Sequence, residues 1–249
     1  MISIIIPTFN EEKVIESTLY ALASTFTLPH QVIVSDGGSS GRTVQFGKIC
    51  GRRRGFFGAR PSDDCARARR RCAKTARGDF LICLDADCVI PEPDRFFTQA
   101  LSQFRKYPNL VALTAYLRVF PREETFGDKL VHGVANLGLR LKNNLFNRGE
   151  SFGKFQMIRR EAFMRLGGFR ADLITIEDAD MFRRLSKIGK TMIDPELTVL
   201  HTGRRAHQVG WPRLIVMWFV NSFFVSVYNR SFTREMEGDS LIPDLGFLG

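Results

Sequence analysis

Three short apolar runs in the first 90 residues are each followed at once by a polar turn. They are Ile2–Ile6, Val32–Val34 and Phe80–Leu84. Continuous apolar runs of this length are typical of strands buried on both faces of a sheet. Segments with helical spacing lie between and after them, so strands and helices alternate. Asn10 is expected to cap the first helix, and further strands are expected near Leu110–Val119, over Lys154–Ile158 and over Thr198–His201. This alternation predicts an α/β fold with a Rossmann-like, mostly parallel central sheet and helices on both faces.

The composition excludes several classes of protein. Of 249 residues, 44% are apolar, and the five cysteines form no C-x-x-C pair. These values are typical of a globular chain and argue against disorder, a disulfide framework and a zinc site. The first residues carry no basic segment and no cleavage site, so we interpret them as a strand rather than a signal peptide. We therefore expect a cytoplasmic protein with reduced thiols.

Positive charge is in excess, with 36 Lys and Arg against 26 Asp and Glu, a net charge of +10. Much of it lies in two clusters, Arg52–Arg54 and the segment from Arg67 to Arg77. Such charge favours anionic partners, although a solvated helix face is the alternative interpretation. The clusters lack the interleaved aromatic residues of many nucleic-acid modules, so no nucleic-acid partner is expected.

Acidic residues follow two of the predicted strands. Asp85 and Asp87 come directly after Phe80–Leu84, and Asp36 follows Val32–Val34. The carboxyl ends of parallel strands meet at one edge of a sheet, where ligands collect. Two carboxylates at this spacing suit Mg²⁺ or Mn²⁺, which also takes diphosphate oxygens and water, whereas an isolated D-x-D can be a solvated turn. Asp36 could accept hydrogen bonds from a base, and the glycines after it form either an anion nest or an ordinary turn.

Four ordered motifs resemble those of family 2 glycosyltransferases. They read S-I-I-I-P-T-F-N-E-E, V-I-V-S-D-G-G-S-S-G-R-T, A-R-G-D-F-L-I-C-L-D-A-D and I-E-D-A-D-M-F-R-R-L. The resemblance spans about residues 1–205 and implies the GT-A fold. It also implies an inverting transfer from a UDP- or GDP-sugar, with Mn²⁺ or Mg²⁺, to a hydroxyl or polyprenyl-phosphate acceptor in glycan or polysaccharide synthesis.

The resemblance also implies roles for individual residues. The nucleotide pocket would be lined by Pro7, Thr8, Phe9 (beside the base), Asn10 and Glu11, with Asp36 holding the base and Arg69 contacting the nucleotide. Asp85 would contact the ribose or the metal ion, and Asp87 would bind the metal ion. In similar enzymes a histidine at the position of His201 can also bind the metal, although a lone histidine is often structural. Asp178 matches the catalytic base, and a carboxylate there could take the acceptor proton. The alternative for Asp178 is charge complementarity in the first turn of a helix.

The chain departs from the family pattern at three places. Ser35 and Gly41 replace acids of the second motif, Arg70 replaces an Asn, and the Q-x-x-R-W box of processive members is absent around Gln208–Trp211. The absence of this box argues against processive polymer synthesis. A sugar-phosphate nucleotidyltransferase is an alternative, but its glycine-rich basic loop is missing after the first strand, and a nucleic-acid-binding module is a second alternative.

We interpret residues 1–205 as one catalytic domain, with a nucleotide-sugar half (1–120) and an acceptor half (121–205). Residues 206–249 form an apolar helix and a tail. The run Leu214–Tyr228 is too short to cross about 30 Å of hydrocarbon as a helix. It could lie at the cytoplasmic membrane surface, cover the sheet as a buried helix, or form a homo-oligomer contact.

Overall fold

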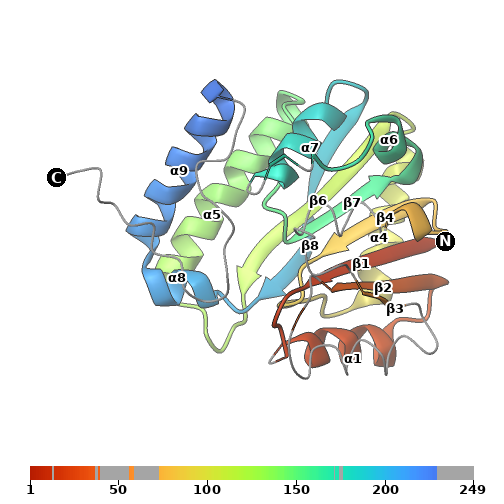
Figure 1. Ribbon diagram of the computed structural model, residues 1–249, viewed down its shortest axis with the longest axis horizontal. Helices are drawn as coiled ribbons and strands as arrows, with labels where there is room; N and C mark the ends of the chain where they lie inside the picture. Colours follow the sequence, from red (N-terminus) through yellow and green to blue (C-terminus); the bar gives the residue numbers. More distant parts are fainter. Residues whose placement is uncertain are drawn as a thin grey trace.

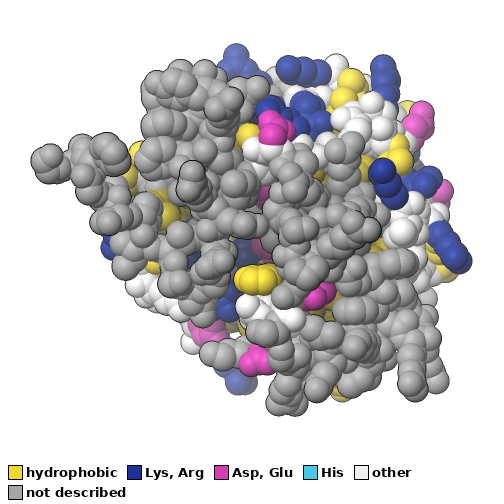
Figure 2. Space-filling view, in the orientation of Figure 1, with side chains coloured by type: hydrophobic (Ala, Val, Ile, Leu, Met, Phe, Trp, Pro, Cys, Tyr) yellow, Lys and Arg dark blue, Asp and Glu magenta, His cyan; other side chains and the backbone are white. Residues whose placement is uncertain are grey.

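The computed structural model describes residues 1–12, 14–36, 39, 56–58, 73–170, 172–173 and 176–228. Arg69 and most of both basic clusters lie outside the described residues, as does the loop after Asp36 other than Ser39. Within the described chain, Lys74 and Arg77 of the second cluster are exposed. Figure 2 shows further Lys and Arg side chains along the upper edge of the molecule.

The described strands form an eight-stranded sheet flanked by helices (Figure 1). The strands are β1 (Ile2–Thr8), β2 (His30–Asp36), β3 (Phe56–Gly58), β4 (Phe80–Leu84), β5 (Cys88–Val89), β6 (Leu110–Val119), β7 (Phe155–Arg159) and β8 (Lys190–His201). The α-helices whose two ends are described are α1 (Ile15–Thr25), α4 (Pro93–Lys106), α5 (Phe126–Arg140), α6 (Arg160–Arg165), α7 (Glu177–Leu185), α8 (Arg204–Val209) and α9 (Trp211–Tyr228). A π-helical segment, η1 (Leu141–Leu145), continues α5.

The strand order is β3-β2-β1-β4-β7-β6-β8-β5. Strands β1 to β4 pair in parallel, as do β6 and β8, whereas β7 runs antiparallel to both neighbours and β5 antiparallel to β8. The predicted α/β fold is therefore confirmed, with antiparallel strands confined to the second half of the order. Because β7 is reversed, its first residues lie at the same edge as the last residues of β4.

Two hydrophobic layers cover the two faces of the sheet, as alternation along the strands requires. Ile4 and Ile6 of β1 pack in the layer that includes α1 and α4. Ile5, between them, packs in the opposite layer with α6 and α7. Helices on both faces were predicted from the sequence, and this prediction is confirmed.

Two local predictions were wrong. Asn10 does not cap a helix, because its φ is 54° and α1 begins only at Ile15. The last strand was expected over 198–201, but β8 begins at Lys190. Its middle, Asp194-Pro195-Glu196, breaks the apolar pattern and coincides with a register irregularity opposite Ala115 and Tyr116. Polar residues at such an irregularity interrupt the apolar pattern of the strand, so the sequence pattern indicates only its second half.

The apolar run near the C-terminus is helical from Trp211 to Tyr228. Among the helices in the described ranges, α9 included, none has the length and hydropathy needed to cross a bilayer.

Candidate active site

The carboxyl ends of β1, β2, β4 and β8 bring most of the predicted site residues to one edge of the sheet. Asp36, at the end of β2, is opposite Thr8, at the end of β1. Asp85 and Asp87 follow β4 on the other side of β1. Neighbouring strands are about 4.8 Å apart, so Asp36 and Asp85 lie roughly 10 Å from each other.

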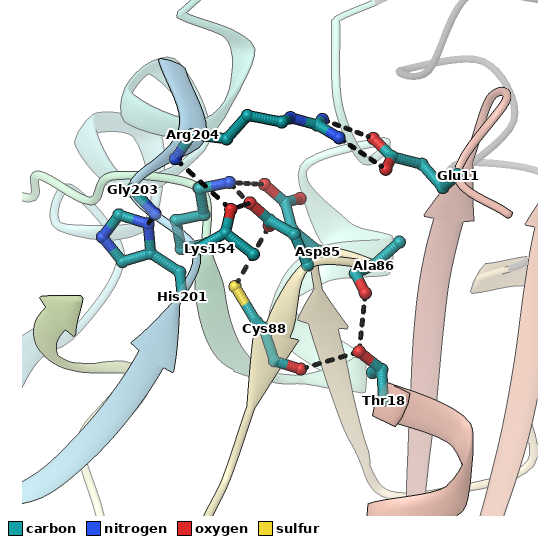
Figure 3. Close-up of polar contacts among 12 residues, drawn as sticks. Glu11, Thr18, Asp85, Ala86, Cys88, Lys154, His201, Gly203 and Arg204 are labelled. Atoms are coloured by element: carbon teal, nitrogen blue, oxygen red, sulfur yellow. Dashed lines mark hydrogen bonds and ion pairs between the residues drawn. The ribbon is translucent and has the colours of Figure 1, made fainter. Parts of the chain in front are cut away.

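The Asp85–Cys88 turn is held from two sides. From α1, the hydroxyl of Thr18 donates to the carbonyl of Ala86 at 2.6 Å and lies 3.1 Å from that of Cys88 (Figure 3). From the segment just before β7, the carbonyl of Lys154 accepts from the backbone N–H of Asp85 at 3.2 Å. These contacts fix the backbone of the turn, so the two carboxylates are presented in a defined place.

Lys154, which precedes β7, places its ammonium between the two carboxylates. Nζ lies 2.8 Å from Oδ1 of Asp87 and 3.2 Å from Oδ2 of Asp85. Burial opposes ionisation of Asp87, but the charge and hydrogen bond of Lys154 outweigh it and lower the pKa of Asp87 to about 2. Burial likewise opposes the charge on Lys154, yet the two carboxylates raise its pKa above the usual range. Asp87 and Lys154 are therefore both charged near neutral pH.

The two carboxylates fit a divalent ion that arrives with a nucleotide. Carboxylate oxygens are the hard donors that Mg²⁺ and Mn²⁺ prefer, and Mg²⁺ usually takes only one or two from the protein, with phosphate oxygens and water completing its shell. Among the residues that the structure describes, no group of three or more His, Cys, Asp or Glu side chains gathers to hold an ion unaided. A metal at Asp85 and Asp87 would therefore depend on ligands from the substrate.

A second ion pair at this edge joins two segments that are far apart in the sequence. The guanidinium of Arg204, at the start of α8, lies 3.2 and 3.4 Å from the two carboxylate oxygens of Glu11, which is 193 residues earlier (Figure 3). Burial raises the pKa of Glu11, and Arg204 opposes that rise. Next to Arg204, the hydroxyl of Thr202 donates to Asp87 at 3.1 Å. We call Glu11, Asp85, Asp87, Lys154 and Arg204 the carboxyl-edge site.

The predicted base pocket lies at the ends of β1 and β2. The carboxylate of Asp36 accepts from the hydroxyl of Ser39 at 2.5 Å and from that of Thr8 at 3.4 Å. The backbone N–H of Asn10 donates to Ser39 at 2.8 Å, so the two loops are joined. Phe9 is 39% exposed and available for stacking. The roles assigned to these residues, and to Pro7 within β1, stay predictions.

His201 is near the carboxyl-edge site but is engaged by its neighbours. Its Nδ1 accepts from the backbone N–H of Gly203 at 3.1 Å, so the ring proton is on Nε2, which lies 3.2 Å from Nε2 of His132. Burial, with the charge of Lys154, lowers the pKa of His201 to about 4, and the ring is neutral near pH 7. Its role as a metal ligand stays a prediction and would require one of these contacts to open.

Asp178 lies in the first turn of α7, close to the start of β7. A Cβ placed on Gly153 would be only 2.1 Å from its Oδ2, so the carboxylate lies directly against the Gly153 backbone. Gly153 has φ of 79°, a left-handed conformation that favours glycine, and the next residue is Lys154. The backbone carbonyl of Asp178 accepts from the side chain of Gln156 at 3.1 Å. The fold thus brings the predicted base beside the carboxyl-edge site.

Sequence reasoning missed Lys154 as a functional residue. It was expected only as the first residue of a strand, 67 residues away from Asp87. No local spacing in the sequence connects Lys154 with Asp87, because the two meet only where the reversed strand β7 returns to the edge of β4.

A separate hollow of about 450 Å³, bordered by Asn144, Asn147 and Lys190, lies near the amino ends of β6 and β8 and is not part of this site.

Two solved structures share this architecture. The mannosyltransferase PcManGT from Pyrobaculum calidifontis, solved with GDP-Man and Mn²⁺, matches with a TM-score of 0.68 at 18% identity, covering 94% of this chain and 65% of that one. Residues 1–349 of TarS from S. aureus, in complex with UDP-GlcNAc, match with a TM-score of 0.63 at 15% identity, covering 94% and 68%. The fold is therefore that of the GT-A glycosyltransferases, as predicted.

Sequence similarity identifies the family as well as the fold. The sequence model of Glycosyl transferase family 2 matches residues 3–167, and the chain belongs to that family. Two curated relatives are the succinoglycan biosynthesis protein ExoA of Rhizobium meliloti, 27% identical over 193 residues, and the poly-beta-1,6-N-acetyl-D-glucosamine synthase of Staphylococcus epidermidis, 24% identical over 179. The matches cover 75% and 70% of this chain but 58% and 43% of those proteins, so the chain spans about half of their length.

Proposed function

We propose that this chain transfers a sugar from a UDP- or GDP-sugar to an acceptor hydroxyl or lipid phosphate, with inversion at the anomeric carbon. The observation that carries the proposal is the meeting of Asp85, Asp87 and Asp178 at one edge of a GT-A sheet. The acids come from separate segments, and Asp178 lies beyond the residues that the family model matches.

The donor side of the proposal rests on β1, β2 and the Asp85–Cys88 turn. The base would bind between Phe9 and Asp36, with ribose and diphosphate extending past β1 toward Asp85. A divalent ion, when bound at Asp85 and Asp87, would neutralise charge on the diphosphate leaving group. Lys154 and Arg204 add positive charge at the same edge, which also favours departure of an anion.

The acceptor side rests on Asp178. Its carboxylate would accept the proton of the acceptor hydroxyl as the new glycosidic bond forms, and the C–O bond to diphosphate breaks on the opposite face. Direct displacement of this kind inverts the anomeric carbon. An acceptor that is already ionised, such as a lipid phosphate, would need no base, so the dependence on Asp178 distinguishes the two acceptor classes.

A thermal-shift panel of UDP, GDP, ADP and CDP, with and without Mn²⁺, tests the donor site. A ligand present at 100 times its Kd stabilises the folded state by about 2.7 kcal/mol, which raises Tm measurably. We expect a metal-dependent rise for UDP or GDP. A shift with none of the four nucleotides would contradict the proposal. In a parallel panel of the matching nucleoside triphosphates, a shift seen only with those ligands would favour a nucleotidyltransferase.

Two variants separate binding from chemistry. Asp87→Ala should abolish the metal-dependent shift, whereas Asp178→Asn should keep the shift and lose transfer to a hydroxyl acceptor. Asp172→Asn, at an exposed position, is the matched control and should behave as the wild type. Unchanged nucleotide affinity in Asp87→Ala, or full turnover in Asp178→Asn with a hydroxyl acceptor, would contradict these roles.

A further inference from the structure

Helix α5 and its continuation η1 turn polar side chains toward the protein. Asp128, His132, Asn136 and Asn143 are all buried. The amide of Asn136 exchanges two hydrogen bonds of 3.1 Å with the backbone of Leu117 on β6. Each of these side chains has a polar partner, so the buried face of α5, where Leu139 is the one apolar residue among those buried, is held mainly by hydrogen bonds.

The opposite face of α5 and η1 is apolar and exposed. Large hydrophobic residues recur at intervals of three or four, which places them in one stripe along the helix. Their exposed fractions are 80% for Phe126, 57% for Leu130, 66% for Val134, 54% for Leu137, 44% for Leu141 and 68% for Leu145. The usual amphipathic arrangement of a surface helix is therefore reversed.

Helix α9 extends this surface. It lies beside α5 (Figure 1). The ring of its first residue, Trp211, packs edge-on against the ring of His132 of α5, with the two ring centroids 5.3 Å apart. Val216, Trp218 and Phe219 of α9 are 59%, 41% and 73% exposed. We call the exposed hydrophobic residues of α5, η1 and α9 the α5–α9 apolar face. A face of this extent is unusual on a monomer in water and marks an interaction surface.

The exposed charges within α5, η1 and α9 are of one sign. Between Phe126 and Arg148 the one acid in the sequence is Asp128, which is buried. The exposed charged residues there are Lys129, Arg140, Lys142, which also pairs with Glu150, and Arg148. The residues of α9 add Arg213 and no acid. An apolar helix face bordered by Lys and Arg is the pattern that binds anionic lipid surfaces.

We propose that the α5–α9 apolar face rests on an anionic lipid bilayer, with α5 lying in the plane of the membrane interface. The first turn of α5 is linked to α8, the helix that follows β8, because Nε2 of His207 donates to the carboxylate of Asp128 at 2.8 Å. Docking would therefore hold the carboxyl-edge site close to the membrane. If the proposed transfer is correct, this position suits a lipid-linked acceptor, although docking itself does not depend on that activity.

Vesicle flotation tests the proposal with the chain as it is. The chain should float with phosphatidylcholine vesicles that contain phosphatidylglycerol and float much less with pure phosphatidylcholine. The double substitution Val134→Glu and Leu137→Glu places two charges on the face and should weaken binding by more than about tenfold, since charged groups are not transferred into the apolar boundary. Tyr20→Glu, on α1 and 72% exposed, is the control and should float as the wild type.

A second measurement needs no variant. Tryptophan fluorescence, which comes from Trp211 and Trp218 of α9, should shift to shorter wavelength with the anionic vesicles and be quenched by brominated lipid chains. Absence of flotation and of quenching would overturn the proposal. So would concentration-dependent dimers, seen by sedimentation, that the double substitution dissociates, because they would assign the face to a second copy. A nucleotide-dependent Tm shift that persists without vesicle binding would leave the proposed transfer standing.

Discussion

The ammonium of Lys154 and the carboxylate of Asp87 are 2.8 Å apart, and the same ammonium reaches Asp85 at 3.2 Å. Two carboxylates held this close repel one another unless a cation lies between them. In this chain a residue of the protein supplies that positive charge. Any divalent ion that binds the pair must share the site with Lys154 or displace it.

Replacement of Lys154 therefore has a predictable effect on metal binding. Lys154→Met removes the internal cation and should tighten the binding of Mn²⁺ alone by about tenfold or more, because a charge–charge repulsion is lost. Titration calorimetry or the free Mn²⁺ signal in electron paramagnetic resonance would measure it. Lys190→Met, distant from this edge, should leave Mn²⁺ affinity unchanged. Equal or weaker affinity in Lys154→Met would show that Lys154 does not compete with metal.

Gly153→Ala tests the placement of Asp178. The added methyl group would collide with the Asp178 carboxylate and would also strain a left-handed backbone. We expect transfer to a hydroxyl acceptor to fall by about a hundredfold or more, as loss of a positioned general base does, while the nucleotide-dependent Tm shift is kept. Gly138→Ala on α5 meets no atom within 4 Å and is the control. Normal turnover in Gly153→Ala would argue against Asp178 as the base.

Asp128 should be a major contributor to stability. Its fully buried carboxylate accepts from Nε1 of Trp211 and from Nε2 of His207, both at 2.8 Å, and from Thr125. Burial opposes its charge, but these hydrogen bonds hold the pKa of Asp128 below its usual range. Asp128→Asn turns an amide toward these donors and should cost about 2–4 kcal/mol in denaturant unfolding. Asp172→Asn, at an exposed position, should cost clearly less, and an equal cost would refute the argument.

Stability of the metal-free chain should fall with mild acid. Burial lowers the pKa of His132, and burial with Lys154 lowers that of His201 to about 4, from 6.5. Below pH 6.5 the unfolded state binds more protons than the folded state, so stability is lost as pH falls from about 6.5 toward 4. Between pH 7.5 and 5, His201 alone should account for roughly 2 kcal/mol. Urea unfolding with a chelator measures this, and unchanged stability over that range would contradict the buried neutral pair.

The sequence by itself determined the local structure and the class of fold. The strand at 80–84 was predicted with the bounds that the structure has, and a strand near 110–119 was predicted where β6 lies, because continuous apolar runs ended by polar turns leave few alternatives. The motifs placed Asp36 and Asp85 at strand ends, and a parallel order then brought them to one edge. Where polar residues interrupt a strand, as in β8, the same reasoning found only half of it.

Contacts between distant segments were decided only by the tertiary structure. Lys154 contacts Asp87, 67 residues away in the sequence, and Arg204 contacts Glu11, 193 residues away. The strand order and the reversal of β7 bring these residues together. The orientation of α5 was likewise decided only by the tertiary structure. Helical spacing shows that a helix has a polar and an apolar face, but which face packs inward depends on the partners that the fold supplies. Here the hydrogen-bonding groups of β6, α8 and α9 receive the polar face, and the apolar face is left outside.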